Sequence, residues 1–171
     1  MIEERKMLDK IKGKVIKLGD NIDTDVIYPG RYLPIIEPEE MALHTLEGID
    51  PDFPKRIEQG DIIVAGKNFG CGSSREQAAT CLKYAGISAV IAKSFSRIFY
   101  RNGINQGLPV IVSDELVDMC TDGDVIECDF TANEIRVGAG KTIQFNGFPD
   151  FIFSILDGGG LIPYVKNKLR T

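Results

Sequence analysis

Two serines and an arginine follow a pair of glycines within residues 67–77, which read Lys-Asn-Phe-Gly-Cys-Gly-Ser-Ser-Arg-Glu-Gln. The apolar run at 61–66 before them predicts a buried strand. Ser73 lies three residues before Glu76, the spacing of a capping box, so we expect Ser73 to cap a helix there. Helix starts and guanidinium groups both bind anions. The two serines and Arg75 therefore predict an anion site that contains a possible proton-transfer group.

On local chemistry alone, the same residues also fit a capped helix after a tight turn, or a non-catalytic module that only binds an anion. Four stretches follow one another along the chain: Asp-Asn-Ile-Asp-Thr-Asp-Val-Ile at 20–27, Gly-Ser-Ser-Arg-Glu at 72–76, Ala-Lys-Ser-Phe-Ser-Arg-Ile-Phe at 92–99, and Gly-Leu-Pro-Val at 107–110. Together, and in this order, they resemble the swivelling domain of the aconitase superfamily. The length of the chain resembles that of the separate small subunits of isopropylmalate isomerase and homoaconitase.

The resemblance implies roles for individual side chains. Ser73 would be the catalytic base, Ser74 would donate to the substrate or support Ser73, and Arg75 would bind a substrate carboxylate. Residues 20–27 would form a substrate loop, and 92–99 would support the serines from behind. The further residues it implicates are Asp23, Thr24 and Asp25 for substrate binding, and Lys93, Ser94 and Arg97 for support.

The stretch 28–36 carries two prolines, a glycine and two tyrosines. It could simply pack on the core, but in the resembled family it reaches over the active site and contacts the variable group of the substrate. Homoaconitase-type small subunits tend to carry an arginine after a Tyr-Leu pair, where this chain has proline. We therefore expect the substrate to place an apolar substituent against this proline, because an unpaired substrate carboxylate there would cost binding free energy. A nearby arginine weakens this inference. The candidate specificity residues are Arg31, Tyr32, Leu33, Pro34, Ile35 and Ile36.

The resemblance implies the small subunit of a hydro-lyase that isomerises a substituted malate by dehydration and rehydration. We expect the 3-isopropylmalate dehydratase type, of leucine biosynthesis, with 2,3-dimethylmalate dehydratase or homoaconitase as alternatives. Loss of hydroxide needs a Lewis acid. In the family this is a [4Fe–4S] cluster on a separate large subunit, so this chain would be inactive without that partner. Its substrate would be a small di- or tricarboxylic acid.

The composition is that of a globular domain. The chain has 171 residues, of which 43% are hydrophobic and 26% charged, which predicts one domain of ordinary size. The net charge of −5 argues against a nucleic-acid binder. No apolar run approaches about 18 residues, and the start lacks the apolar core of a signal peptide. We therefore expect a cytoplasmic protein without a membrane segment.

The four cysteines include no C-x-x-C pair, and the chain has one histidine. We therefore expect this chain to hold neither a metal ion nor an iron–sulfur cluster by itself. The aspartates at 20–25 lack the central glycine and the final glutamate of an EF-hand loop, so a calcium site is disfavoured.

The order of elements predicts an α/β fold, which the resemblance identifies as a swivelling β/β/α domain: a parallel strand–helix–strand core followed by an antiparallel β meander. We place this domain at residues 13–171 and treat 1–12 as an N-terminal extension, in which a short helix is possible. The strands are expected at 14–18, 61–66, 87–92, 108–112, 124–129, 134–137 and 141–145, and the helices at 38–46, 73–85, 94–106, 149–156 and 161–169.

Overall fold

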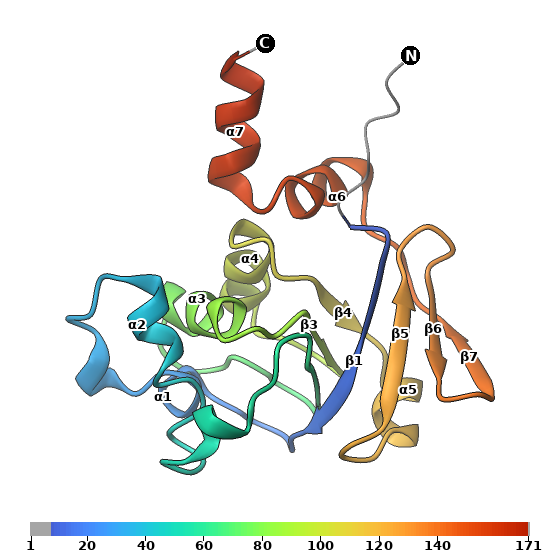
Figure 1. Cartoon of the computed structure of the whole chain (residues 1–171), viewed down its shortest axis with the longest axis horizontal. Helices are drawn as coiled ribbons and strands as arrows, with labels where there is room; N and C mark the ends of the chain where they lie inside the picture. Colours follow the sequence, from blue (N-terminus) through green and yellow to red (C-terminus); the bar gives the residue numbers. More distant parts are fainter. Residues whose placement is uncertain (1–7, 171) are drawn as a thin grey trace.

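The computed structural model describes residues 8–170, and these residues form one seven-stranded sheet covered by helices (Figure 1). Neighbouring strands follow the order β4-β3-β2-β1-β5-β6-β7. The predicted α/β class, with a parallel core and an antiparallel meander, is confirmed. The strands are β1 Lys10–Lys17, β2 Ile62–Ala65, β3 Ala89–Ala92, β4 Val110–Val112, β5 Val125–Asp129, β6 Glu134–Val137 and β7 Lys141–Gln144.

Strand β1 joins the two halves of the sheet. It runs parallel to β2, with Val15 opposite Ile62, and antiparallel to β5, with Ile11 opposite Cys128. It begins at Lys10, so the boundary that we placed after residue 12 cuts through a strand, and no helix forms from Lys10 to residue 12. The alternation of lysines with small or apolar residues explains the strand. The start of the expected helix, at residues 1–7, lies outside the described part of the chain.

Helices cover both faces of the sheet. Helix α5, which the sequence analysis did not predict, has Ser113 as its N-cap, whose hydroxyl accepts a hydrogen bond from the amide of Leu116 at 3.3 Å. None of the helices in residues 8–170 is long and apolar enough to cross a membrane. The helices are α1 Thr24–Ile27, α2 Pro38–Ala42, α3 Glu76–Tyr84, α4 Arg97–Asn105, α5 Asp114–Met119, α6 Asp150–Asp157 and α7 Leu161–Arg170, with 3₁₀ turns at Gly30–Tyr32 and Phe53–Arg56.

The parallel strands are buried on both faces. In β2, Ile63 and Ala65 pack in the core cluster that includes residues of α3, α4 and α6, while Ile62 and Val64 pack in the cluster shared with α5 and the meander. Because both faces are covered, these strands read as unbroken apolar runs. Figure 1 shows α3 and α4 beside the parallel strands, and α7 extending away from the body of the domain.

Candidate active site

The candidate site is built on residues 67–75, which we call the serine loop and which follow the carboxyl end of β2. Gly70 turns this loop with φ +78°, a conformation that favours glycine, and a Cβ there would lie 2.3 Å from the side chain of Phe99. The loop is held from behind, because Ser96 Oγ donates to the carbonyl of Gly70 at 2.7 Å and the amide of Phe69 donates to the carbonyl of Ser94 at 3.0 Å. Its backbone path is therefore set by the segment before α4.

The predicted capping box at Ser73 is wrong. Helix α3 begins at Glu76, and its N-cap is Arg75, whose backbone is extended and whose side chain makes no capping bond. The carboxylate of Glu76 does not reach back to Ser73 but accepts a hydrogen bond from Gln106 Nε2 at 2.8 Å. Tertiary contacts of the serine loop hold its backbone outside the helix, so the local pattern is overridden.

Ser73 and Ser74 are both exposed, and within residues 8–170 neither hydroxyl has a hydrogen-bond partner. They lie directly before Arg75 and the free amides at the start of α3. Two unengaged hydroxyls in front of a helix start and a guanidinium can receive an anionic ligand from solvent.

The aspartate loop, which we define as residues 19–25, lies against the serine loop. Thr24 is 3% exposed; its amide donates to the carbonyl of Cys71 at 2.9 Å and its hydroxyl donates to the carbonyl of Ser73 at 2.8 Å. Asp23 caps α1 by accepting from the amide of Val26 at 2.8 Å. The structure thus places Asp23 and Thr24 beside the serine loop; the side chain of Thr24 connects the two loops, and that of Asp23 caps α1.

Asp25 connects the same two loops through an ion pair. Arg75 Nη1 donates to Asp25 Oδ1 at 2.7 Å and to the carbonyl of Tyr28 at 3.2 Å, and the amide of Gly30 donates to the same Asp25 oxygen at 2.9 Å. The hydrogen bond from Arg75 is the main cause that keeps the pKa of Asp25 below its usual value, with the amide of Gly30 adding to it. The guanidinium of Arg75 is therefore held in one orientation and is paired with an ionised carboxylate.

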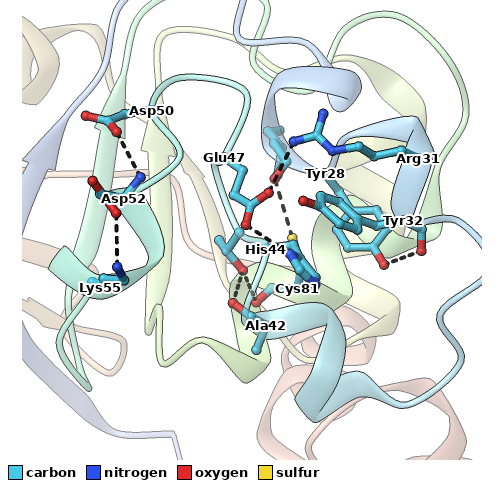
Figure 2. A network of polar contacts seen from close by, with 12 residues as sticks. Tyr28, Arg31, Tyr32, Ala42, His44, Glu47, Asp50, Asp52, Lys55 and Cys81 are labelled. Atoms are coloured by element: carbon cyan, nitrogen blue, oxygen red, sulfur yellow. Dashed lines mark hydrogen bonds and ion pairs between the residues drawn. The ribbon is translucent and has the colours of Figure 1, made fainter.

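The expected specificity loop is stabilised by a cluster that the sequence analysis did not foresee (Figure 2). Arg31 Nη2 lies 3.3 Å from Glu47 Oε2, and His44 Nδ1 lies 2.9 Å from Glu47 Oε1. The ring of Tyr32 stacks on His44 with centroids 3.6 Å apart, and the guanidinium of Arg31 lies 4.7 Å from the centroid of Tyr32. Burial raises the pKa of Glu47, but polar contacts with Tyr32, His44 and Arg31 outweigh it and keep that pKa below its usual value.

Beyond Tyr32, the loop presents apolar side chains to solvent. Leu33 is 39% and Ile36 82% exposed, Pro34 is exposed, and Ile35 packs against the core. Arg31 is engaged with Glu47, so the exposed tip offers no free cation.

The three residues expected to support the serine loop differ in position. Ser94 Oγ accepts a hydrogen bond from the amide of Asn68 at 2.8 Å, inside the loop. Lys93 instead pairs with Asp118 of α5 at 2.5 Å. Arg97 is exposed, and no hydrogen bond or ion pair reaches its guanidinium from within residues 8–170.

Two further residues position the loop and were not singled out from the sequence. Asp20 Oδ1 accepts from the amide of Lys67 at 2.7 Å, and Asn68 adopts φ +62°. Asparagine tolerates this left-handed conformation, so its place just before the glycines was a usable signal.

The cysteines are dispersed. Cys81, Cys120 and Cys128 are buried, and Cys71 is half-buried in the serine loop. Within residues 8–170 no three His, Cys, Asp or Glu side chains come close enough to hold a metal ion. Burial raises the pKa of Cys81 to about 12, which further disfavours a thiolate ligand there.

Comparisons with known proteins identify relatives of this chain. The aconitase C-terminal domain family matches residues 39–115. The isopropylmalate/citramalate isomerase small subunit of Methanocaldococcus jannaschii is 52% identical over 160 residues, covering 93% of this chain and 95% of the relative. The 3-isopropylmalate dehydratase small subunit of Ruminiclostridium cellulolyticum is also 52% identical, over 159 residues, covering 92% and 98%.

Solved structures point the same way. The crystal structure of 3-isopropylmalate dehydratase from Methanocaldococcus jannaschii superposes with a TM-score of 0.89 at 50% identity, covering 94% of this chain and 96% of that one. Aconitase X from Thermococcus kodakaraensis, at 17% identity and a TM-score of 0.51, shares the fold alone.

Fold and site loop together define a C-terminal, swivelling domain of the aconitase class. Within that class, the chain belongs to the family of 3-isopropylmalate dehydratase small subunits. It is thereby a subunit of a hydro-lyase, and the interpretation as a non-catalytic anion-binding module loses its support.

Proposed function

We propose that this chain supplies half of an active site that isomerises a substituted malate by removing water and adding it back at the neighbouring carbon. The observation that carries the proposal is the serine loop, which holds two unengaged hydroxyls beside a fixed guanidinium at the carboxyl end of a parallel strand. Open α/β sheets bind their ligands at this end. The family supplies the class of reaction, and the loop supplies the residues.

Ser73 is the base in this proposal. A serine hydroxyl is a very weak base, so Ser73 acts as an alkoxide stabilised by the free amides at the start of α3 and by Arg75. Ser73 takes the proton from the carbon beside a carboxylate, and the C–H electron pair becomes a carbon–carbon double bond. The C–O bond of the adjacent carbon breaks with its electron pair, so the group leaves as hydroxide, which a proton from solvent converts to water. Rehydration runs the same steps in reverse at exchanged positions, and Ser73 returns its proton to carbon.

Arg75 binds a substrate carboxylate, and Ser74 donates a hydrogen bond to it or to Ser73. Nη1 of Arg75 is already engaged by Asp25 and the carbonyl of Tyr28, so its remaining N–H groups are the ones that meet the substrate. Thr24 contributes by connecting the two loops, Asp23 by capping α1, and Asp25 by orienting the guanidinium.

Departure of the hydroxyl group needs a Lewis acid, and the dispersed cysteines of this chain do not fit a cluster. We place a [4Fe–4S] cluster on a separate large subunit, which the designation of the relatives as small subunits supports. The exposure of both serines is consistent with a site that is completed by a partner surface.

The substrate that fits the loop best is 3-isopropylmalate, an intermediate of leucine biosynthesis. The exposed Leu33 and Ile36 offer an apolar wall, and Arg31 is neutralised by Glu47 rather than free for an extra carboxylate. A homoaconitase substrate would leave that carboxylate unpaired, which is costly. Citramalate, which the Methanocaldococcus relative includes in its name, has a smaller apolar substituent and suits the same wall.

Turnover by this chain, mixed with a cognate large subunit whose cluster has been reconstituted, tests the proposal. We expect isomerisation of 3-isopropylmalate, lower or comparable activity on citramalate and 2,3-dimethylmalate, and kcat/KM at least about a hundredfold lower on homocitrate. Preference for homocitrate would overturn the substrate assignment. No turnover of any of these acids by a stable, cluster-loaded complex would overturn the reaction itself.

A further inference from the structure

Two adjoining hollows lie along α4, and neither is explained by the chemistry above. One, of about 460 Å³, is lined by residues of α4, α6 and Leu161 of α7. Both hollows include Arg97 and Tyr100, so we treat them as one feature, the α4 groove. The other hollow, of about 360 Å³, is lined by Lys93, Ser94, Phe95, Arg97, Tyr100 and Val112.

The floor of the α4 groove is apolar. Tyr100 and Ile104 line it from α4, and Phe151 and Ile152 line it from α6. Phe151 is 61% exposed, and Val112, at the other end of the groove, is 53% exposed. Large apolar side chains that stay exposed in a hollow are typical of surfaces that another protein covers.

Two cations border this apolar floor. Arg97 and Arg101 are four residues apart, on one face of α4, and both are exposed. No hydrogen bond or ion pair from the rest of residues 8–170 reaches either guanidinium. Lys93, in contrast, is paired with Asp118. In a chain with net charge −5, this pair of free arginines is a local site for carboxylates.

Residues of the α4 groove contact the serine loop of the candidate active site from behind. Ser94 lines the groove and accepts the hydrogen bond from the amide of Asn68 in the serine loop. Phe95, also in the groove, packs edge-on against Phe69 of the same loop with ring centroids 6.0 Å apart. A partner that completes the site over the serine loop is therefore adjacent to one end of the groove.

We propose that the α4 groove docks an acidic segment of the large subunit, with an apolar side chain against Phe151 and Tyr100 and carboxylates paired with Arg97 and Arg101. This inference rests on the proposed function, which requires the partner. A second copy of the same chain fits the groove less well. A two-fold contact through this face would bring the free arginines of both copies together, and like charges repel.

Binding and turnover are measured separately to test the inference. The large subunit, with its cluster reconstituted, is titrated into fluorescently labelled small subunit, and the apparent Kd is read for each variant. We expect Arg101→Glu to raise Kd at least about tenfold and Phe151→Ala about fivefold, while Arg101→Lys stays near wild type. Arg136→Glu, a charge reversal on β6 that also removes a long contact with Glu127 at 3.8 Å, is the control away from the groove and should change Kd less than about twofold.

At saturating large subunit, Arg101→Glu should keep kcat within about twofold of wild type, because its defect is in assembly. Equal weakening by Arg101→Glu and Arg136→Glu would overturn the inference. The inference would also be overturned if Arg101→Glu left the Kd for the large subunit unchanged but abolished self-association in sedimentation. That result would assign the groove to a second copy of this chain. Ser73→Ala should bind normally without turnover; if Ser73→Ala turns over at the wild-type rate, the proposed chemistry fails while the docking result stands by itself.

Discussion

Arg75 and Asp25, fifty residues apart in sequence, form the ion pair that connects the serine loop to the aspartate loop, with Nη1 2.7 Å from Oδ1. The amide of Gly30 donates to the same oxygen of Asp25, so the entry to the specificity loop is tied to the pair as well. This one contact therefore sets the orientation of the guanidinium, the spacing of the two loops and the position at which the specificity loop begins. A small displacement here should affect substrate binding before it affects folding.

Gly30→Ala is the mildest test of this contact. A Cβ at position 30 would lie 3.2 Å from Arg75 Nη2 and 3.4 Å from Asp25 Oδ1, so the guanidinium must shift by a few tenths of an ångström. We expect KM to rise about tenfold with little change in Tm, because misaligned binding groups cost affinity. Gly19→Ala is the control, since nothing lies within 4 Å of a Cβ there. Steady-state kinetics with no difference between the two variants would contradict the role of the pair.

Gly70 sets the path of the serine loop, and its replacement should destabilise the protein. The φ of +78° and the 2.3 Å approach to Phe99 mean that Gly70→Ala combines backbone strain with overpacking, at a cost of about 3 kcal/mol. Gly123→Ala has a similar φ of +87° but nothing within 4 Å, so it carries the strain alone, about 1 kcal/mol. Urea unfolding of both variants separates the two effects; equal losses would show that the contact with Phe99 is unimportant.

Much of the fold could be predicted from the sequence because its signals are local. Strands β2 and β3 are buried on both faces, so every residue in them is apolar, and such a run predicts a buried strand without knowledge of its neighbours. Helix α5 was missed because its six residues are too few to show a helical period, although Ser113 and the two acidic residues after it were signals of a helix start. Strand β1 was predicted too short because its first residues alternate with charged lysines. Pairing with β5 stabilises these residues as a strand, and a local sequence pattern does not show that pairing.

The roles of the candidate site residues stay predictions, and the geometry that the structure gives them was not predicted from the sequence. Ser73 has the spacing of a cap, yet its carbonyl accepts from Thr24, forty-nine residues earlier, and the backbone at Arg75 stays extended. The ion pair of Arg31 with Glu47 was missed for the same reason, because α2 lies between them in the sequence, whereas His44 and Glu47 are only three residues apart. A local sequence pattern cannot predict contacts between loops that are distant in the sequence.

Ionisation of Glu47 makes part of the free energy of unfolding depend on pH in the acid range. Its pKa is lowered in the folded state, so its contribution is fully present above the pKa of an unfolded glutamate, about 4.3, and is lost as pH falls through the lower folded value. We expect Glu47→Gln to lower Tm at pH 7 and to flatten the decline of Tm below about pH 4.5. Thermal unfolding measured from pH 7 to pH 3 gives both slopes; parallel curves for the two proteins would contradict the assignment.

The thiols should differ in reactivity. Burial raises the pKa of Cys81 and of Cys128 to about 12, and Cys120 is also buried, while Cys71 is half-buried in the serine loop. In the native protein, a maleimide should modify Cys71 first, and the other three only after unfolding. Because Cys71 lies two residues before Ser73, its modification should abolish turnover. Mass spectrometry after brief labelling checks both points; early labelling of Cys81 would show that the core opens more readily than its packing indicates.

The central claim is that Ser73 takes the substrate proton. The most direct measurement is the exchange of that carbon-bound hydrogen with deuterium from solvent, in the assembled two-subunit enzyme with saturating 3-isopropylmalate, for wild type and Ser73→Ala. We predict that Ser73→Ala binds the substrate with a Kd within about threefold of wild type but loses exchange by at least about a thousandfold. Exchange at the wild-type rate in Ser73→Ala would contradict the account and move the base to another residue.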